Sequence, residues 1–180
     1  VLADFVETRT NDRVGLVVCQ GSSITLSPLT TDYDALAESI VSADQLQLRD
    51  GTAIGVALGE SVNVLRGSGA ATRIVILLTD GENNAGEIEP LAAARIAERL
   101  GARVYTVGMV SRGGLQTPRS TLNVDEASMR SIAEVTGGTY SRAEDPDGLA
   151  EVYAKIDELE KSRIAGEEFT RYAEIAPWFL

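Results

Sequence analysis

The chain has 180 residues, enough for one domain with a sizeable buried core. The 16 basic and 27 acidic side chains give a formal net charge of −11, which disfavours nucleic acid as a partner and favours a cation or a basic protein surface. Histidine is absent, so a Ser-His-Asp triad, a Cys-His pair and a His-bearing zinc site are excluded. The single cysteine, Cys19, cannot form an internal disulfide.

The periodicity of apolar residues predicts alternating strands and helices after a short opening segment that looks like the end of an amphipathic helix. In chain order the prediction is a helix end (1–9), strands (13–20 and 23–28), helices (32–43 and 54–65), a strand (73–78), a helix (90–101), a strand (102–109), a helix (125–138), an edge strand (139–144) and a last helix (146–162).

Capping residues support the helix assignments. Asp32 and Asp125 precede helical patterns and are predicted N-caps. Pro90 stands where a first helical residue is expected, whereas Gly101 and Gly137 stand just past predicted helix ends.

Gly55 and Gly59 interrupt the helix predicted over 54–65, which otherwise has Ile54, Leu58 and Val62 on one face. Because glycine lowers helix propensity, the two glycines indicate close packing against a neighbouring segment.

The strands predicted at 73–78 and 102–109 lack polar alternation, which is typical of parallel strands covered on both faces. We therefore predict an α/β fold, a doubly wound and mostly parallel sheet with helices on both faces. Ligands in such folds bind beyond the carboxyl ends of the strands, and Asp80 follows one of these ends directly.

Three chemistries are compatible with Asp80. It can be a turn residue before Gly81, capping the loop with its side chain. It can be an aspartyl nucleophile, although Glu82 replaces the second acid expected two residues on. It can also bind a hard cation such as Mg²⁺ together with Thr52, a hydroxyl residue that could otherwise serve as a helix cap. Asn83 and Asn84 are predicted to be turn residues in the same crevice.

Several stretches resemble the von Willebrand factor A (VWA) domain of bacterial Bat-type proteins, which are associated with aerotolerance and with MoxR-type AAA+ ATPases. They include "RDGTAIGVAL", "RIVILLTDGENNAGEIEPLAAARIAERLGARVYTVGM" and "VDEASMRSIAEVTGGTYSRAED". The resemblance covers about residues 1–163 and implies a Rossmann-like VWA fold. It also implies a metal-ion-dependent adhesion site (MIDAS) for Mg²⁺ or a similar divalent cation, with Thr52 and Asp80 as metal ligands. No catalytic residue is implied, so the chain is not expected to be an enzyme.

The chain departs from the family in one respect. The family's first strand, at the centre of the sheet, and its Asp-x-Ser-x-Ser loop have no counterpart in the 180 residues. We therefore expect a domain that is incomplete at its N-terminus, with weak or absent metal binding. The unpaired strands would be closed by a rearranged pairing, by a second chain, for example in a dimer, or by upstream residues.

The resemblance also implies a wider setting. Residues 1–163 would be the VWA domain, and residues 164–180, ending on Trp178, a tail before a transmembrane helix. The intact protein would be anchored in a bacterial membrane with this domain in the periplasm. Expected partners are proteins, such as other Bat-type subunits or a MoxR-type system.

The functional alternatives are a metal-free assembly domain and, less well supported, an Asp-dependent hydrolase. The loop at 111–121 is expected to be a surface loop or part of a partner-binding rim.

Overall fold

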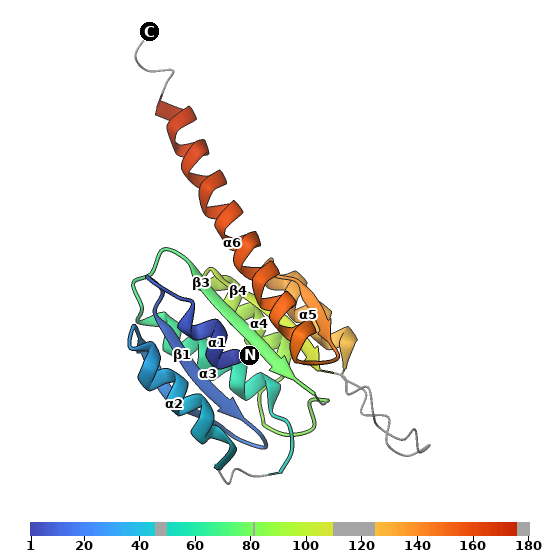
Figure 1. Cartoon of the computed structure of the whole chain (residues 1–180). Coiled ribbons are helices and arrows are strands. Elements are labelled where there is room, and N and C mark those ends of the chain that lie inside the picture. The colour runs from blue at the N-terminus through green and yellow to red at the C-terminus, as the bar shows by residue number, and fades with distance from the viewer. Residues whose placement is uncertain (46–49, 81, 110–124, 176–180) are drawn as a thin grey trace.

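The computed structural model describes residues 1–45, 50–80, 82–109 and 125–175. Helices and strands alternate along this part of the chain as predicted (Figure 1). In chain order the elements are α1 (Leu2–Glu7), β1 (Val14–Cys19), β2 (Ser23–Thr30), α2 (Tyr33–Ser42), the 3-10 helix η1 (Ala43–Gln45), α3 (Ile54–Arg66), β3 (Arg73–Thr79), α4 (Pro90–Arg99), β4 (Ala102–Met109), α5 (Glu126–Thr136), β5 (Tyr140–Ala143) and α6 (Pro146–Ile175).

The predicted capping residues lie at the helix ends that the sequence indicated. The Asp32 carboxylate accepts a hydrogen bond from the Ala35 N–H at 3.1 Å and caps α2. Asp125 caps α5 in the same way, and its hydrogen bonds with Ser128 lower the pKa of Asp125. Gly137 ends α5 in the left-handed region at φ 73°.

α6 is longer than predicted. It continues as one helix to Ile175 and therefore crosses the predicted boundary at residue 163. In Figure 1 its carboxyl-terminal half projects away from the rest of the domain. None of the helices in the described part of the chain is long and apolar enough to span a bilayer.

Two sheets make up the strand layer. β3, β4 and β5 form a parallel sheet in that order, with β5 at its edge as predicted. β1 and β2 form a separate antiparallel pair.

The helices cover both faces of the parallel sheet, so the doubly wound α/β prediction is confirmed. Val75 and Leu77 of β3 belong to a core cluster with residues of α3, α4 and α5. Ile74 and Ile76, which alternate with them, pack instead with the cluster that contains residues of α1 and α6. This division follows from the two-residue period of a strand, which sends successive side chains to opposite faces.

β1 and β3 each have one edge with no strand partner among the described residues, because β1 pairs with β2 and β3 pairs with β4. We call the two edges formed by Val14–Cys19 of β1 and by residues 73–78 of β3 the open lane. α3 packs against both strands, which point the same way in Figure 1. At the amino ends of the strands, the Arg13 guanidinium donates to the Ser68 carbonyl.

Residues 1–12 contain helix α1 and no strand, as expected. α1 packs against α2 and α6, and its Phe5 ring stacks on Tyr153 with 4.7 Å between ring centroids. Of the three expected outcomes for the unpaired strands, a rearranged pairing is therefore not found in the described part of the chain.

Candidate functional site

Asp80 follows the carboxyl end of β3, directly after the buried Thr79, and its side chain is exposed. Parallel pairing with β4 runs as far as Thr79, so Asp80 stands at the carboxyl edge of the sheet. Among the described residues the Asp80 carboxylate has neither a hydrogen bond nor an ion pair. The interpretation of Asp80 as a side-chain cap for its own loop therefore gains no support.

Thr52 lies in the loop before α3 and is half-buried. The N-cap position of α3 belongs to Ala53, which has no capping side chain, so Thr52 does not cap this helix. Its hydroxyl has no hydrogen-bond partner in the part of the chain that the structure describes. Thr52 and Asp80 thus each carry an oxygen that the described fold leaves available.

Backbone contacts bring the segments that carry these two residues together. The Thr52 carbonyl accepts hydrogen bonds from the Asn84 N–H at 3.1 Å and the Ala85 N–H at 3.2 Å. The end of β1 reaches the same place, since the Gln20 carbonyl accepts from the Ala53 N–H at 2.8 Å. The carboxyl ends of β1 and β3 therefore converge on the amino end of α3.

Asn83 and Asn84, predicted to be turn residues, have a more specific role. The Ile54 N–H donates to Asn83 Oδ1 at 2.9 Å, and the Thr52 N–H donates to Asn84 Oδ1 at 2.8 Å. Both bonds cross about thirty residues of chain, 29 and 32 positions respectively. Sequence reasoning could not assign these partners because the two segments are distant along the chain.

Glycines allow this close approach. Gly51 has φ 115°, and a Cβ added there would lie 2.9 Å from the Ala85 Cβ. Gly86 has φ 85°, and an added Cβ would lie 2.7 Å from Val56 Cγ2. A side chain at either position would push the two segments apart.

A hydroxyl and a carboxylate suit a hard cation in their chemistry, because Mg²⁺ prefers oxygen ligands and keeps several waters. In number they are few: no cluster of three or more acidic, cysteine or histidine side chains suitable for a metal occurs among the described residues. The residues present fit such an ion only if waters or other donors complete its coordination.

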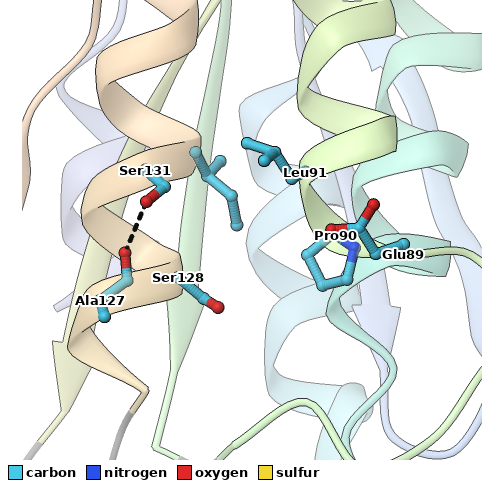
Figure 2. A pocket seen from close by; sticks show the side chains of 7 residues that line it. Glu89, Pro90, Leu91, Ala127, Ser128 and Ser131 are labelled. Carbon is cyan, nitrogen blue, oxygen red and sulfur yellow. Dashed lines mark hydrogen bonds between the residues drawn. The ribbon is translucent and has the colours of Figure 1, made fainter.

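A shallow pocket of about 210 Å³ lies elsewhere, between the amino ends of α4 and α5. Figure 2 shows Pro90 and Leu91 on one side and Ser128 and Ser131 on the other. The Ser131 hydroxyl already donates to the Ala127 carbonyl at 2.9 Å. Neither Thr52 nor Asp80 lines this pocket, so it is separate from the predicted metal site.

The loop predicted at 111–121 and the end of the tail at Trp178 lie outside the described residues.

Comparisons with known proteins relate the chain to a family. A family model for the von Willebrand factor type A domain matches residues 1–155. The chain is 26% identical over 159 residues to an uncharacterized protein of Borreliella burgdorferi, covering 88% of this chain and 44% of that protein. It is 27% identical over 203 residues to a UPF0353 protein of Nocardia farcinica, covering 98% and 58%. The chain thus spans about half the length of these curated relatives.

Solved structures show the same fold. An aerotolerance-related membrane protein from Bacteroides fragilis is 25% identical with a TM-score of 0.68, covering 87% of this chain and 83% of that one. The conserved hypothetical protein BatB from Bacteroides thetaiotaomicron is 24% identical with a TM-score of 0.70, covering 89% and 85%. Proximal thread matrix protein 1 from the mussel byssus, with a zinc-occupied MIDAS motif, is 19% identical with a TM-score of 0.65, covering 88% and 38%.

Proposed function

The chain belongs to the von Willebrand factor type A family, and on that premise we propose that it is a protein-binding domain that contacts its partner through a divalent cation. Thr52 and Asp80 would hold the cation, and a carboxylate of the partner would complete its coordination. The observation that carries this proposal is that both side chains have available oxygens while hydrogen bonds hold their two segments together.

The mussel protein supports the proposal at the level of the fold, because its MIDAS motif holds a zinc ion. The exposure of Asp80 also fits, since a metal-binding carboxylate must be reachable by a partner. With two protein ligands and an ion that gives up its waters reluctantly, we expect only weak Mg²⁺ binding by these 180 residues. Stronger binding would need further oxygen ligands from a strand that occupies the open lane.

Titration with Mn²⁺ followed by NMR tests the metal site, because this paramagnetic ion broadens nearby amide signals even when it binds weakly. We expect selective broadening around Asp80 and Thr52 that Mg²⁺ reverses by competition and that Asp80→Asn removes. Asp34→Asn, a change at an exposed aspartate of α2, is the control and should leave the broadening in place. Broadening that survives Asp80→Asn would contradict the proposal.

We propose further that the whole protein is anchored in a bacterial membrane, with this domain in the periplasm and residues 164–180 as the tail next to the bilayer. Its partners would be other Bat-type subunits or proteins of a MoxR-type system. The similarity to an aerotolerance-related membrane protein supports this setting. Co-purification of a Bat-type subunit with the full-length protein should be lost in EDTA and in the Asp80→Ala variant. A complex that resists both treatments would exclude a metal-bridged contact.

The second candidate is a metal-free assembly domain, which the open lane favours because unpaired strand edges are templates for another strand. A domain of this type would dimerise or assemble without Mg²⁺. Light scattering coupled to size-exclusion chromatography, with and without Mg²⁺, separates the two candidates. An enzymatic role is the least supported, since none of the relatives named above has an enzymatic name.

A further inference from the structure

We propose that Asn83 and Asn84, in the loop after β3, are positioning residues that fix Thr52 relative to Asp80. Asn83 caps helix α3, and Asn84 holds the backbone of Thr52. The inference rests on the proposed metal site and adds two residues to it. Neither asparagine is proposed to bind the metal.

The first step is the missing cap of α3. The first N–H groups of a helix have no partner within the helix, and a side chain at the N-cap usually accepts a hydrogen bond from one of them. The N-cap of α3 is Ala53, which cannot do this. Asn83 supplies the acceptor instead, since its Oδ1 lies 2.9 Å from the Ile54 nitrogen in a partly buried contact.

The second step is the double link between Asn84 and Thr52. The Thr52 N–H donates to the Asn84 side chain at 2.8 Å, and the Asn84 N–H donates to the Thr52 carbonyl at 3.1 Å. Both backbone groups of Thr52 are therefore engaged by the loop that starts at Asp80. This leaves the Thr52 hydroxyl as the free polar group of the residue and restricts where that hydroxyl can lie.

The third step concerns charge. Asparagine and aspartate cap helices about equally well, and a helix amino end favours negative charge. Here the cap Asn83 and the neighbouring acceptor Asn84 are neutral amides within four residues of Asp80. Two more carboxylates at these positions would compete for a cation and would repel an approaching carboxylate of a partner. The two neutral amides hold the geometry without adding charge. Asp80, directly after β3, and the exposed Glu82 are then the two acids of residues 80–84.

The test is amide hydrogen exchange combined with the Mn²⁺ titration on the same chain. Asn84→Ala should speed exchange of the Thr52 N–H by about tenfold, the effect of losing one net hydrogen bond. It should also reduce Mn²⁺ broadening at Thr52 several-fold while broadening at Asp80 persists. Asn84 is exposed, so its truncation leaves no cavity. Asn63→Ala, at an exposed position of α3, is the matched control and should change neither readout.

Asn84→Asp supplies a readout that a merely structural role would not change. It keeps an acceptor for the Thr52 N–H, so exchange protection should return, while the added charge should strengthen broadening around residue 84. Unchanged exchange at Thr52 in Asn84→Ala, or unchanged broadening there, would overturn the positioning role and leave the proposed function intact. No broadening near Asp80 in the unaltered chain would instead overturn the proposed function, whatever the exchange data show.

Discussion

Glu160 is a charged side chain inside the core, with 5% of its surface exposed. The Arg103 guanidinium donates to both of its carboxylate oxygens, at 2.9 Å from Nε and 2.5 Å from Nη2. The Tyr105 hydroxyl donates to the same carboxylate, and burial together with this contact raises the pKa of Tyr105 to about 12. This cluster ties α6 to β4 and explains how a buried acid is tolerated, since its hydrogen bonds replace water.

We predict that Glu160→Ala lowers the free energy of unfolding by about 3 kcal/mol, because it leaves the Arg103 charge without its partner in a mostly buried place. Urea denaturation followed by circular dichroism measures the change. Glu158→Ala, at an exposed position of the same helix, should cost less than about 0.5 kcal/mol. Equal effects of the two changes would contradict the role of the cluster.

Asp157 gives the stability a defined pH dependence. Hydrogen bonds from Arg9 and then from Lys161 hold the pKa of Asp157 below its usual value. The folded chain therefore binds this proton less readily than the unfolded chain, so the stabilisation is complete above the unfolded-state pKa of about 4. It disappears as the pH falls through the folded-state pKa.

We therefore predict that Asp157→Asn lowers the unfolding free energy by about 1 kcal/mol at pH 7. The effect is modest because the ion pair with Arg9 is only partly shielded from water. The difference from the unaltered chain should shrink as the pH falls below about 4. Urea titrations between pH 3 and pH 7 test this. Glu151→Gln, at an exposed position of α6, should show no such trend, and a gap that stays constant down to pH 3 would refute the prediction.

At the scale of elements, α3 and the loop after β3 act as one unit. The sequence predicted that Gly55 and Gly59 mark close packing against a neighbouring segment. In the structure only one of the two glycines does so. A Cβ at Gly55 would overlap the Ile88 carbonyl oxygen, whereas a Cβ at Gly59 would lie 3.6 Å from Ile88 Cδ1, an ordinary contact. Close packing is thus confirmed at Gly55, and Gly59 is a helix glycine with room for a methyl group.

We predict opposite effects of two matched substitutions on this face. Gly55→Ala should destabilise the domain by about 2 kcal/mol or more, because the loop must move off the helix. Gly59→Ala should stabilise it by about 0.5–1 kcal/mol through the better helix propensity of alanine. Thermal unfolding of both variants measures the two signs. Stabilisation by Gly55→Ala would show that the loop does not pack on α3 as described.

At the scale of the whole molecule, the open lane divides the strand layer. Successive N–H groups of a strand point to opposite edges, so only some of those in β3 reach β4. Between Thr106 and Gly108, by contrast, β4 has a strand on each side.

Amide hydrogen exchange should therefore alternate along β3, with every second N–H exchanging at least about tenfold faster than its neighbours. The N–H groups of Thr106, Val107 and Gly108 should be uniformly protected and serve as the internal reference. Uniform protection along β3 at high protein concentration, lost on dilution, would instead show that a second copy occupies the lane.

The sequence by itself determined the order of elements, the helix caps at Asp32 and Asp125, and the doubly wound class. These depend on local periodicity, on capping chemistry and on the apolar content of single strands. It also pointed to Thr52 and Asp80, through a motif resemblance, and their role as metal ligands remains a prediction.

Only the tertiary structure decided what surrounds Asp80. The acid at the end of β3 has no described partner of its own, while Asn83 and Asn84, which looked like turn residues, reach across the chain to the amino end of α3. The buried Glu160 with Arg103 was likewise outside the prediction. Hydrogen-bonding groups separated by 29 to 57 positions meet only through packing of whole elements, and no local pattern encodes which of them will meet.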